Sequence, residues 1–312
     1  MRGRTPVDLG PVEVGGVVLR NPVMTASGTA GHDVELAHRM DLASLGAVVV
    51  KSLHVQPWPG NPAPRVHMAG NGMLNAVGLE GPGVTAWCEH SLPRLEGTGA
   101  TVVASIWGRA VDEYAAAARA LAAVGPRVAA VEVNLSCPNL EGRNSIFAHD
   151  TSTTSAVISA VCAELAVPVW AKLSANTDRI VDVAAAAASA GASAVTLINT
   201  MLGMQISLDS ARPVLGNGGG GLSGPPIHAI AVRAVHDVAV ALPGVDIIGV
   251  GGISDGAGAV EMMMVGAKAV QVGTATFARP DACARVLAGA ARAVRSGGGT
   301  SWRSVHRRAI GE

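Results

Sequence analysis

Short apolar runs alternate with alanine-rich stretches along most of the chain. The runs are rich in β-branched residues and continuous rather than alternating, which is typical of strands buried on both faces of a parallel sheet. Eight of them are expected strands: Val23–Thr25, Ala47–Val50, Val102–Ser105, Ala130–Asn134, Val169–Lys172, Val195–Ile198, Ile247–Val250 and Ala269–Val272. Helices are expected between them: Val111–Ala123, Thr153–Leu165, Ile180–Ala190, Ile227–Ala241, Gly256–Val265 and Ala282–Arg295. Eight strand–helix units favour a (β/α)8 TIM barrel over an open sheet.

Three segments do not follow this alternation. Val12–Val14 and Val17–Leu19 flank a Gly-Gly pair, which predicts a hairpin with a primed turn that caps one end of the barrel. Two connections, Ser52–Thr101 after strand two and Thr200–Pro226 after strand six, are too long for simple loops. We expect the first, which is rich in proline, to be an ordered but irregular cover over the barrel mouth. The second is rich in glycine, and we expect it to open and close.

Length and composition fit one barrel domain over residues 1–312. The chain is 49% apolar and its formal net charge is zero, so no excess of positive charge attracts nucleic acid. No run of about 18 apolar residues and no signal-peptide pattern is present, which predicts a soluble protein that does not associate with membranes. The four cysteines form no CxxC pair. We therefore expect a cytoplasmic location with free thiols.

Polar residues follow the carboxyl ends of the expected strands, where the active sites of barrels lie. Lys51 and Ser52 follow strand two, the hexapeptide Asn134–Asn139 ends strand four, Lys172 ends strand five, and Asn199-Thr200 follows strand six. The chain has three lysines against twenty arginines. Where arginine supplies most of the positive charge, a retained lysine indicates that a compact ammonium is needed.

Glycines stand at the ends of the last two strands. Gly251-Gly252 follows strand seven and Gly273-Thr274 follows strand eight, which is where barrels commonly bind phosphate through backbone N–H groups. Either pair alone could serve only a tight turn. Together they favour a ligand that carries a phosphate. The nine histidines have no HExxH or clustered spacing, so no metal site is expected.

Motifs spread from Asn21 to Phe277 resemble those of the catalytic subunit of class 1 dihydroorotate dehydrogenases, most closely the NAD-linked (class 1B) type. The hexapeptide Asn134–Asn139 and the octapeptide Gly72–Leu79 are the specific ones, whereas many phosphate-binding barrels share the glycine pairs. The resemblance implies that the protein binds FMN and oxidises (S)-dihydroorotate to orotate in pyrimidine biosynthesis.

The resemblance also implies which residues bind cofactor and substrate. The FMN contacts would be Ser27, Lys51, Ser52, Ser105, Asn134, Lys172, Ile198, Gly224, Gly251, Gly252, Gly273 and Thr274. The substrate contacts would be Lys51, Asn75, Ala76, Val77, Gly78, Leu79, Asn134, Asn139, Asn199 and Thr200. Asparagine side chains suit a ring of amides because each offers a donor and an acceptor. Ser105 departs from the usual asparagine, so one hydrogen bond to the flavin ring would be lost or replaced by water.

Oxidation of dihydroorotate requires a base that removes the C5 proton while hydride leaves C6 for the flavin. Cys137 is the candidate base, because it lies just past a strand end between asparagines. A free thiol has a pKa of about 8.5, so a nearby positive charge or donor would help it act as thiolate near neutral pH. Cys88, Cys162 and Cys283 are expected to be inert apolar side chains.

Two other functions stay open. A dihydropyrimidine dehydrogenase-type subunit would share the barrel, the flavin and the cysteine base but act on uracil or thymine. Asn139 favours orotate, because relatives that act on uracil tend to have histidine there. A non-catalytic phosphate-binding barrel could serve as a scaffold subunit, but it would need neither the Cys-Pro-Asn loop nor the two strand-end lysines.

The electron acceptor is not determined by this chain. It has no cysteine cluster for an iron–sulfur centre and no GxGxxG between a strand and a helix, so it is not expected to use NAD by itself. The resemblance implies a homodimer that binds a separate electron-transfer subunit carrying FAD and a [2Fe–2S] cluster. Fumarate is the alternative acceptor.

Overall fold

The central element of the computed structural model is a sheet of eight parallel strands. The structure describes residues 7, 9–136, 138–139, 145–146 and 149–311. The strands are ordered β3-β18-β17-β12-β11-β8-β7-β4. Their bounds are β3 Val23–Thr25, β4 Val48–Val49, β7 Val102–Ile106, β8 Ala130–Asn134, β11 Val169–Lys172, β12 Ala194–Leu197, β17 Ile247–Val250 and β18 Ala269–Val272. All eight expected strands are confirmed.

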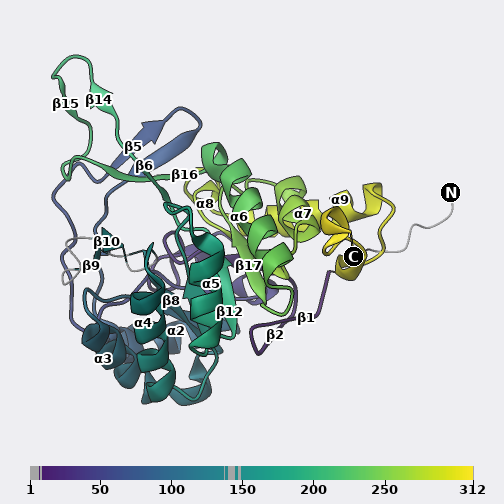
Figure 1. Cartoon of the computed structure of the whole chain (residues 1–312), viewed down its shortest axis with the longest axis horizontal. Helices are drawn as coiled ribbons and strands as arrows, with labels where there is room; N and C mark the ends of the chain where they lie inside the picture. The colour runs from purple at the N-terminus through teal and green to yellow at the C-terminus, as the bar shows by residue number, and fades with distance from the viewer. Residues whose placement is uncertain (1–6, 8, 137, 140–144, 147–148, 312) are drawn as a thin grey trace.

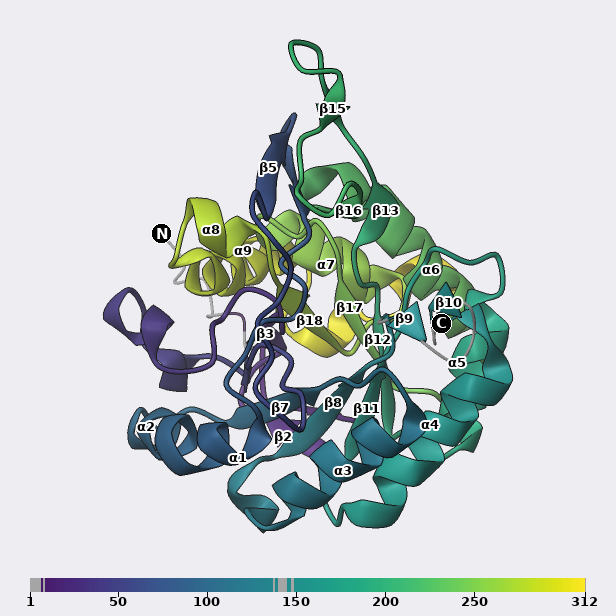
Figure 2. The ribbon, with the colours of Figure 1, turned by 90° about the vertical axis from the view of Figure 1, so that its left-hand side faces the viewer.

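The sheet closes between β3 and β4, so the architecture is the expected (β/α)8 barrel (Figure 2). Met24 and Ala47 form a parallel bridge across this seam, and the Thr25 N–H donates to the Ala47 carbonyl. The Thr25 hydroxyl accepts from the Val49 N–H at 2.8 Å and donates to the Val49 carbonyl at 3.1 Å. The buried Thr25 side chain therefore supplies hydrogen bonds between β3 and β4, where few backbone groups pair with each other.

Helices surround the barrel (Figures 1 and 2). The six expected helices are confirmed to within about two residues: α3 Val111–Ala122, α4 Thr151–Glu164, α5 Ile180–Ser189, α6 His228–Ala241, α7 Gly256–Met264 and α9 Ala282–Ser296. Asp150 caps α4 by accepting from the Thr153 N–H, and Asp255 caps α7 by accepting from the Gly258 N–H.

Shorter elements complete the chain. They are α1 Val84–Ala86, the π-helix η3 Trp87–Ser91, α2 Leu92–Gly97, α8 Ala275–Ala278, the 3-10 turns η1 Glu35–His38, η2 Leu42–Ser44, η4 Gly125–Arg127, η6 Pro225–Ile227, η7 Trp302–Ser304 and η8 Arg308–Ile310, and the strand pair β9 Pro138–Asn139 and β10 Ser145–Ile146. The segment α1–η3–α2 supplies the helical layer between β4 and β7.

The hairpin of β1 (Val12–Val14) and β2 (Val17–Leu19) closes the amino-terminal end of the barrel, as expected. Both turn glycines have positive φ, 52° at Gly15 and 77° at Gly16, as a primed turn requires. The Trp170 indole N–H donates to the Gly15 carbonyl at 3.0 Å, and the Gly15 N–H donates to Asp246 at 2.9 Å. The hairpin is thus fastened to two barrel segments.

Alternate strand residues project into the barrel and form layers. The layer beside the hairpin is apolar and includes Ala130, Trp170, Ala194 and Ala269. Two residues further along the same strands, the inward side chains are polar: Glu132, Lys172, Thr196 and Gln271. Glu132 accepts hydrogen bonds from Thr196 and Gln271, which lie on strands that do not neighbour β8 in the sheet. Such contacts are possible only through the barrel interior.

The two long connections pair with each other above the barrel mouth. They form a four-stranded antiparallel sheet in the order β13-β16-β6-β5, with bounds β5 Val66–Ala69, β6 Gly72–Asn75, β13 Met201–Gly203 and β16 Gly220–Ser223. A two-stranded arm, β14 Ile206–Ser207 and β15 Arg212–Pro213, projects beyond it (Figure 1). The expectation of an irregular first connection is therefore wrong in this part, because its backbone groups find ladder partners about 145 residues away.

The Gly15 turn leads to a stability prediction. A Cβ at Gly15 would lie against the Trp170 indole nitrogen and 2.7 Å from the Ala194 Cβ, whereas Gly125 has almost the same φ, 53°, and no atom within 4 Å. We expect Gly125→Ala to lower the free energy of unfolding by about 1 kcal/mol, the cost of left-handed backbone. Gly15→Ala should lose about 1–3 kcal/mol more through steric overlap. Urea unfolding of both variants measures the difference, and equal losses would contradict this packing.

Candidate active site

A cavity of about 1000 Å³ lies at the carboxyl ends of the barrel strands, under the four-stranded sheet. This is the upper end of the range for small-molecule sites, and it would hold a cofactor and a small substrate together. The predicted site residues that line it are Ser27, Lys51, Ser52, Asn75, Ala76, Val77, Gly78, Leu79, Asn134, Lys172, Ile198, Asn199, Thr200, Gly224, Gly251, Gly252, Gly273 and Thr274. Residues from seven of the eight expected strand ends therefore converge, and the exception is the end of strand three.

Three predicted residues are not among those lining the cavity. Ser105 is fully buried behind Ser52, with 2.9 Å between the two hydroxyl oxygens, so it reaches the cavity only through Ser52. Cys137 lies outside the described residues. The backbone of Asn139 belongs to β9, but its side chain is also outside the described part. The roles of all three stay predictions.

A chain of side-chain amides crosses the floor of the cavity. Asn134, the last residue of β8, donates from Nδ2 to the Ser52 hydroxyl at 3.3 Å and accepts at Oδ1 from Asn199 Nδ2 at 3.1 Å. The Asn199 Oδ1 in turn accepts from the Thr200 N–H at 2.9 Å. Three strand ends thus hold one another's amides in fixed orientations.

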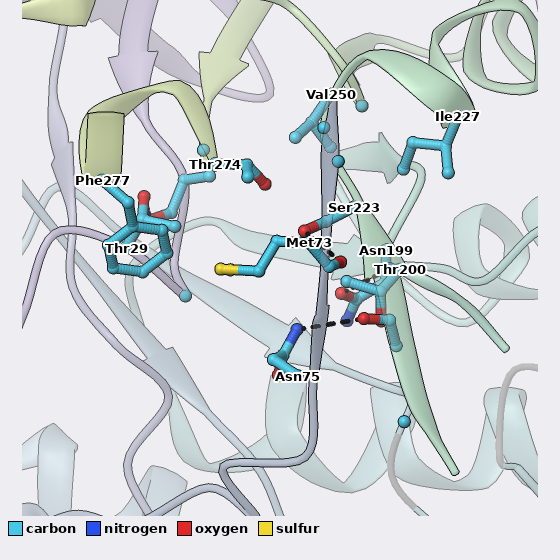
Figure 3. Close-up of a pocket in the computed structure, with 18 of the residues that line it drawn as sticks. Thr29, Met73, Asn75, Asn199, Thr200, Ser223, Ile227, Val250, Thr274 and Phe277 are labelled. Carbon is cyan, nitrogen blue, oxygen red and sulfur yellow. Dashed lines mark hydrogen bonds between the residues drawn. The ribbon is translucent and has the colours of Figure 1, made fainter. Parts of the chain in front are cut away.

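The two opposite walls of the cavity are formed by different segments of the chain. Asn75 of β6 donates to the Gly221 carbonyl of β16 at 3.3 Å, and Gly221 lies against the Thr200 side chain, with Asn199 beside it (Figure 3). Figure 3 shows these three residues on one side, and Thr274 and Phe277 on the other. The asparagines from the barrel and from the upper sheet therefore face the same part of the cavity.

Asn176 is a lining residue that the sequence analysis did not identify. It follows β11, and its Nδ2 donates to the Thr200 carbonyl at 3.0 Å and to the Ser174 hydroxyl at 2.7 Å. Its Oδ1 accepts from the Leu202 N–H at 2.8 Å. One amide therefore fixes the backbone at the point where the second long connection leaves the barrel. Its place four residues after a strand-end lysine was the only available signal.

Two lysines bring positive charge to different parts of the cavity. Lys172 is almost fully buried, and its Nζ donates to the Ser27 hydroxyl at 3.1 Å and to Gln271 Oε1 at 3.2 Å. Lys51 is half-buried, and burial lowers the pKa of its ammonium, helped by the charge of Arg65. Such groups suit a ligand with a carboxylate and a ring that becomes negative.

His32 beside Lys51 is held neutral. Burial, and then the Lys51 charge, lower the pKa of His32 to about 4. Near neutral pH the imidazole therefore adds no charge, and Lys51 supplies positive charge to this end of the cavity.

Glycines form a backbone cradle at the ends of β16, β17 and β18. Gly224, Gly251 and Gly252 have positive φ values of 88°, 131° and 68°. A Cβ at Gly252 would lie 2.8 Å from the Gly224 carbonyl oxygen, and one at Gly251 would lie 2.7 Å from the Ala231 Cβ. Only glycine fits these positions, and the bare backbone can approach a phosphate closely. The residues present fit a phosphate-bearing flavin.

The polar layer below the cavity floor was also missed from the sequence. Glu132, Thr196 and Gln271 are fully buried, and all three are hydrogen-bonded within the barrel. A signal existed: β8, β11, β12 and β18 each carry a polar residue two positions after a small or aromatic inward one. The outward Val, Ala and Leu positions make these runs continuously apolar by pattern and hide the single inward polar residue of each.

Two classes of feature are absent from the described residues. Among the helices of that part, none combines the length and apolar character needed to cross a membrane. Within the same residues, no group of three or more His, Cys, Asp or Glu is placed to hold a metal ion.

Comparison with known proteins identifies relatives over nearly the whole chain. The family model described as dihydroorotate dehydrogenase matches residues 11–293. The catalytic subunit of dihydroorotate dehydrogenase B (NAD(+)) from Geobacter sulfurreducens is 45% identical over 277 residues, 89% of this chain and 90% of that protein. The protein of the same name from Desulforudis audaxviator is 48% identical over 279 residues, again 89% and 90%. The chain therefore belongs to the dihydroorotate dehydrogenase family.

Proposed function

We propose that this chain is the catalytic subunit of an FMN-dependent dihydroorotate dehydrogenase that oxidises (S)-dihydroorotate to orotate in cytoplasmic pyrimidine biosynthesis. The proposal treats residues 1–312 as one FMN-binding barrel domain. The observation that carries it is the convergence, in one cavity, of the Lys172 ammonium, the amide chain and the glycine cradle. Membership of the family and the names of the relatives support the same activity.

The cofactor would be held at both ends of the cavity. The cradle of Gly224, Gly251, Gly252, Gly273 and Thr274 would bind the phosphate through backbone N–H groups. At the other end, the flavin ring would be bound by Ser27, Lys51, Ser52, Asn134, Lys172 and Ile198, with Ser105 acting through Ser52. When bound, FMN supplies the acceptor for the hydride that leaves C6 of the substrate.

The substrate would be recognised by the amide chain. Asn75, Asn134, Asn199 and Thr200 present donors and acceptors to the ring N–H and C=O groups, with Asn139 completing the set and the 76–79 segment packing on the ring. Lys51 would pair with the substrate carboxylate. Cys137 would take the C5 proton, so that the C5–H electron pair forms the new double bond as hydride departs from C6.

The two alternative functions fit the cavity less well. Uracil and thymine have no carboxylate, so a half-buried Lys51 directed at the cavity would have no anionic partner from such a substrate. A scaffold barrel would need only the glycine cradle. It would not need the amide chain that fixes Asn134 and Asn199.

Anaerobic mixing with dihydroorotate tests cofactor, substrate and base together. Purified protein should be yellow, with about one FMN per chain, and should bleach when dihydroorotate is added. Cys137→Ala should keep FMN but bleach about 10²–10⁴-fold more slowly, the range for loss of a general base. Cys162→Ala is the matched control, because Cys162 lies on α4 and does not line the cavity. Colourless protein, or bleaching by uracil derivatives instead, would overturn the proposal.

Asn176 should set the affinity for the product. Asn176→Ala removes the bonds to the Thr200 carbonyl and the Leu202 N–H, each worth about 0.5–1.5 kcal/mol. We expect orotate to bind roughly 10–100-fold more weakly, read from the flavin spectrum, with FMN content unchanged because the cradle lies on other strands. Thr177→Ala, which removes an acceptor of the Arg179 N–H and does not touch Thr200 or Leu202 among the described contacts, should bind orotate normally. Loss of FMN rather than of orotate affinity would contradict this role.

We also propose that the chain forms a homodimer and passes electrons to a separate subunit with FAD and a [2Fe–2S] cluster. Exposed apolar side chains cluster on the upper sheet and the projecting arm: Val66, Met68, Leu202, Met204, Ile206 and Leu208. Patches of this kind on a monomer mark protein interfaces. Leu208, at the tip of the arm, is 96% exposed.

Light scattering and an electron-acceptor assay test the assembly. The purified chain should have the mass of a dimer. It should reduce NAD only when the electron-transfer subunit of a class 1B enzyme is added. A monomeric chain would exclude the dimer, and efficient NAD or fumarate reduction by the chain alone would exclude the need for a second subunit.

A further inference from the structure

A carboxylate in the middle of the barrel is not explained by the proposed chemistry. Glu132 is fully buried in the polar layer and does not line the cavity. Its Oε2 accepts from the Gln271 amide at 2.6 Å and from the Thr196 hydroxyl at 3.0 Å. Its Oε1 accepts no hydrogen bond in the described part of the chain and lies 3.5 Å from the Lys172 ammonium. One carboxylate therefore faces a lysine that does line the cavity.

The charges of this pair have no other compensation nearby. Among the residues that the structure describes, Glu132 and Lys172 are the only Asp, Glu, Lys or Arg that are almost fully buried. Removal of one member of such a pair leaves an uncompensated charge in a low-dielectric interior, which is strongly destabilising. A carboxylate is not needed merely to fill this layer, because the neutral side chains of Thr196 and Gln271 occupy two of its other positions.

Gln271 determines how closely the two charges approach. Its Nε2 donates to Glu132, which orients the amide so that Oε1 faces Lys172 and accepts from the ammonium. The ammonium is thereby shared among Glu132, Gln271 and the Ser27 hydroxyl at the cavity wall. The glutamine amide holds Lys172 between the carboxylate below and the cavity above.

We propose that Glu132 and Gln271 are positioning residues for Lys172: Glu132 offsets part of the positive charge that Lys172 presents to the flavin, and Gln271 keeps the ammonium from closing onto Glu132. This inference rests on the proposed FMN site. Substitution of Glu132 and substitution of Gln271 should therefore change the positive charge at the cavity in opposite directions. Loss of the carboxylate increases the positive charge at the cavity, whereas loss of the glutamine amide withdraws the ammonium toward Glu132.

Sulfite affinity of the FMN-loaded protein measures this charge without turnover. Sulfite adds reversibly to oxidised flavins and makes the ring anionic, so positive charge nearby strengthens its binding. We expect Glu132→Gln to bind sulfite about tenfold more tightly than the wild type. Gln271→Leu should bind it several-fold more weakly. Thr196→Val removes a hydrogen bond that an uncharged hydroxyl donates to the same carboxylate oxygen. Its sulfite affinity should stay within about threefold of that of the wild type.

The opposite signs separate positioning from a purely structural role. A structural role would weaken the site in the same direction in both variants, so equal losses, or an unchanged affinity in either one at full FMN occupancy, would overturn the proposal. A wild-type protein that binds no flavin would instead refute the proposed function.

The melting temperature of the apoprotein tests the Glu132–Lys172 pair even if a variant does not take up FMN. Glu132→Gln and Lys172→Met should each lower it by about 10 °C. The double variant has no unpaired charge, so it should recover at least half of the summed loss. Additive losses would show that the two charges are independent and would overturn the pairing.

Discussion

The closure of the barrel is the constraint on which the rest of the structure depends. Once β3 meets β4 through Met24, Ala47 and the Thr25 hydroxyl, every second side chain of eight strands projects into a space that must be filled without solvent. Polar groups in that space need partners from other strands, because an unpaired buried polar group is costly. The layers of the interior, and the fixed Lys172 at its top, follow from this requirement.

The closure of the barrel also holds the residues of the cavity floor in place. Asn134, Asn199 and Ser52 stand on strand ends held by the parallel ladders, and their amide and hydroxyl groups orient one another across the barrel mouth. Asn176 extends this network to the start of the second long connection. A substrate would therefore meet donors and acceptors whose directions are already set, which lowers the entropy lost on binding.

The cavity roof has a different origin. It comes from two connections far apart in the chain, joined where Leu222 pairs with Leu74 and Gly221 with Asn75. The upper sheet has a small core cluster of its own, in which Ala69, Val214 and Leu222 pack against the buried Leu74, Ala76 and Leu215. The cavity thus has a floor held by the barrel ladders and a roof with a separate, smaller core.

The sequence by itself determined the barrel and many of the residues that line the cavity. Strands that are buried on both faces, such as Val169–Lys172, have continuous apolar sequences, and helical segments separate them at regular intervals. In such βα units the carboxyl ends of all strands lie at the same rim of the barrel. The sequence alone therefore assigns Lys51, Lys172, Asn134 and the glycine pairs to one cavity. Gly15-Gly16 likewise encodes its own turn, because both positions require positive φ.

Only the tertiary structure decided which residues meet across long separations. The pairing of β6 with β16 depends on backbone groups about 145 residues apart, and no local pattern encodes it. The hydrogen-bond donors to Glu132, Gln271 and Thr196, come from strands that do not neighbour β8, so these contacts exist only once the barrel has closed. Asn176 belongs to the site because its side-chain amide hydrogen-bonds two backbone groups of another loop. Local propensity acts within a few residues, whereas burial and hydrogen bonding select partners by distance in space.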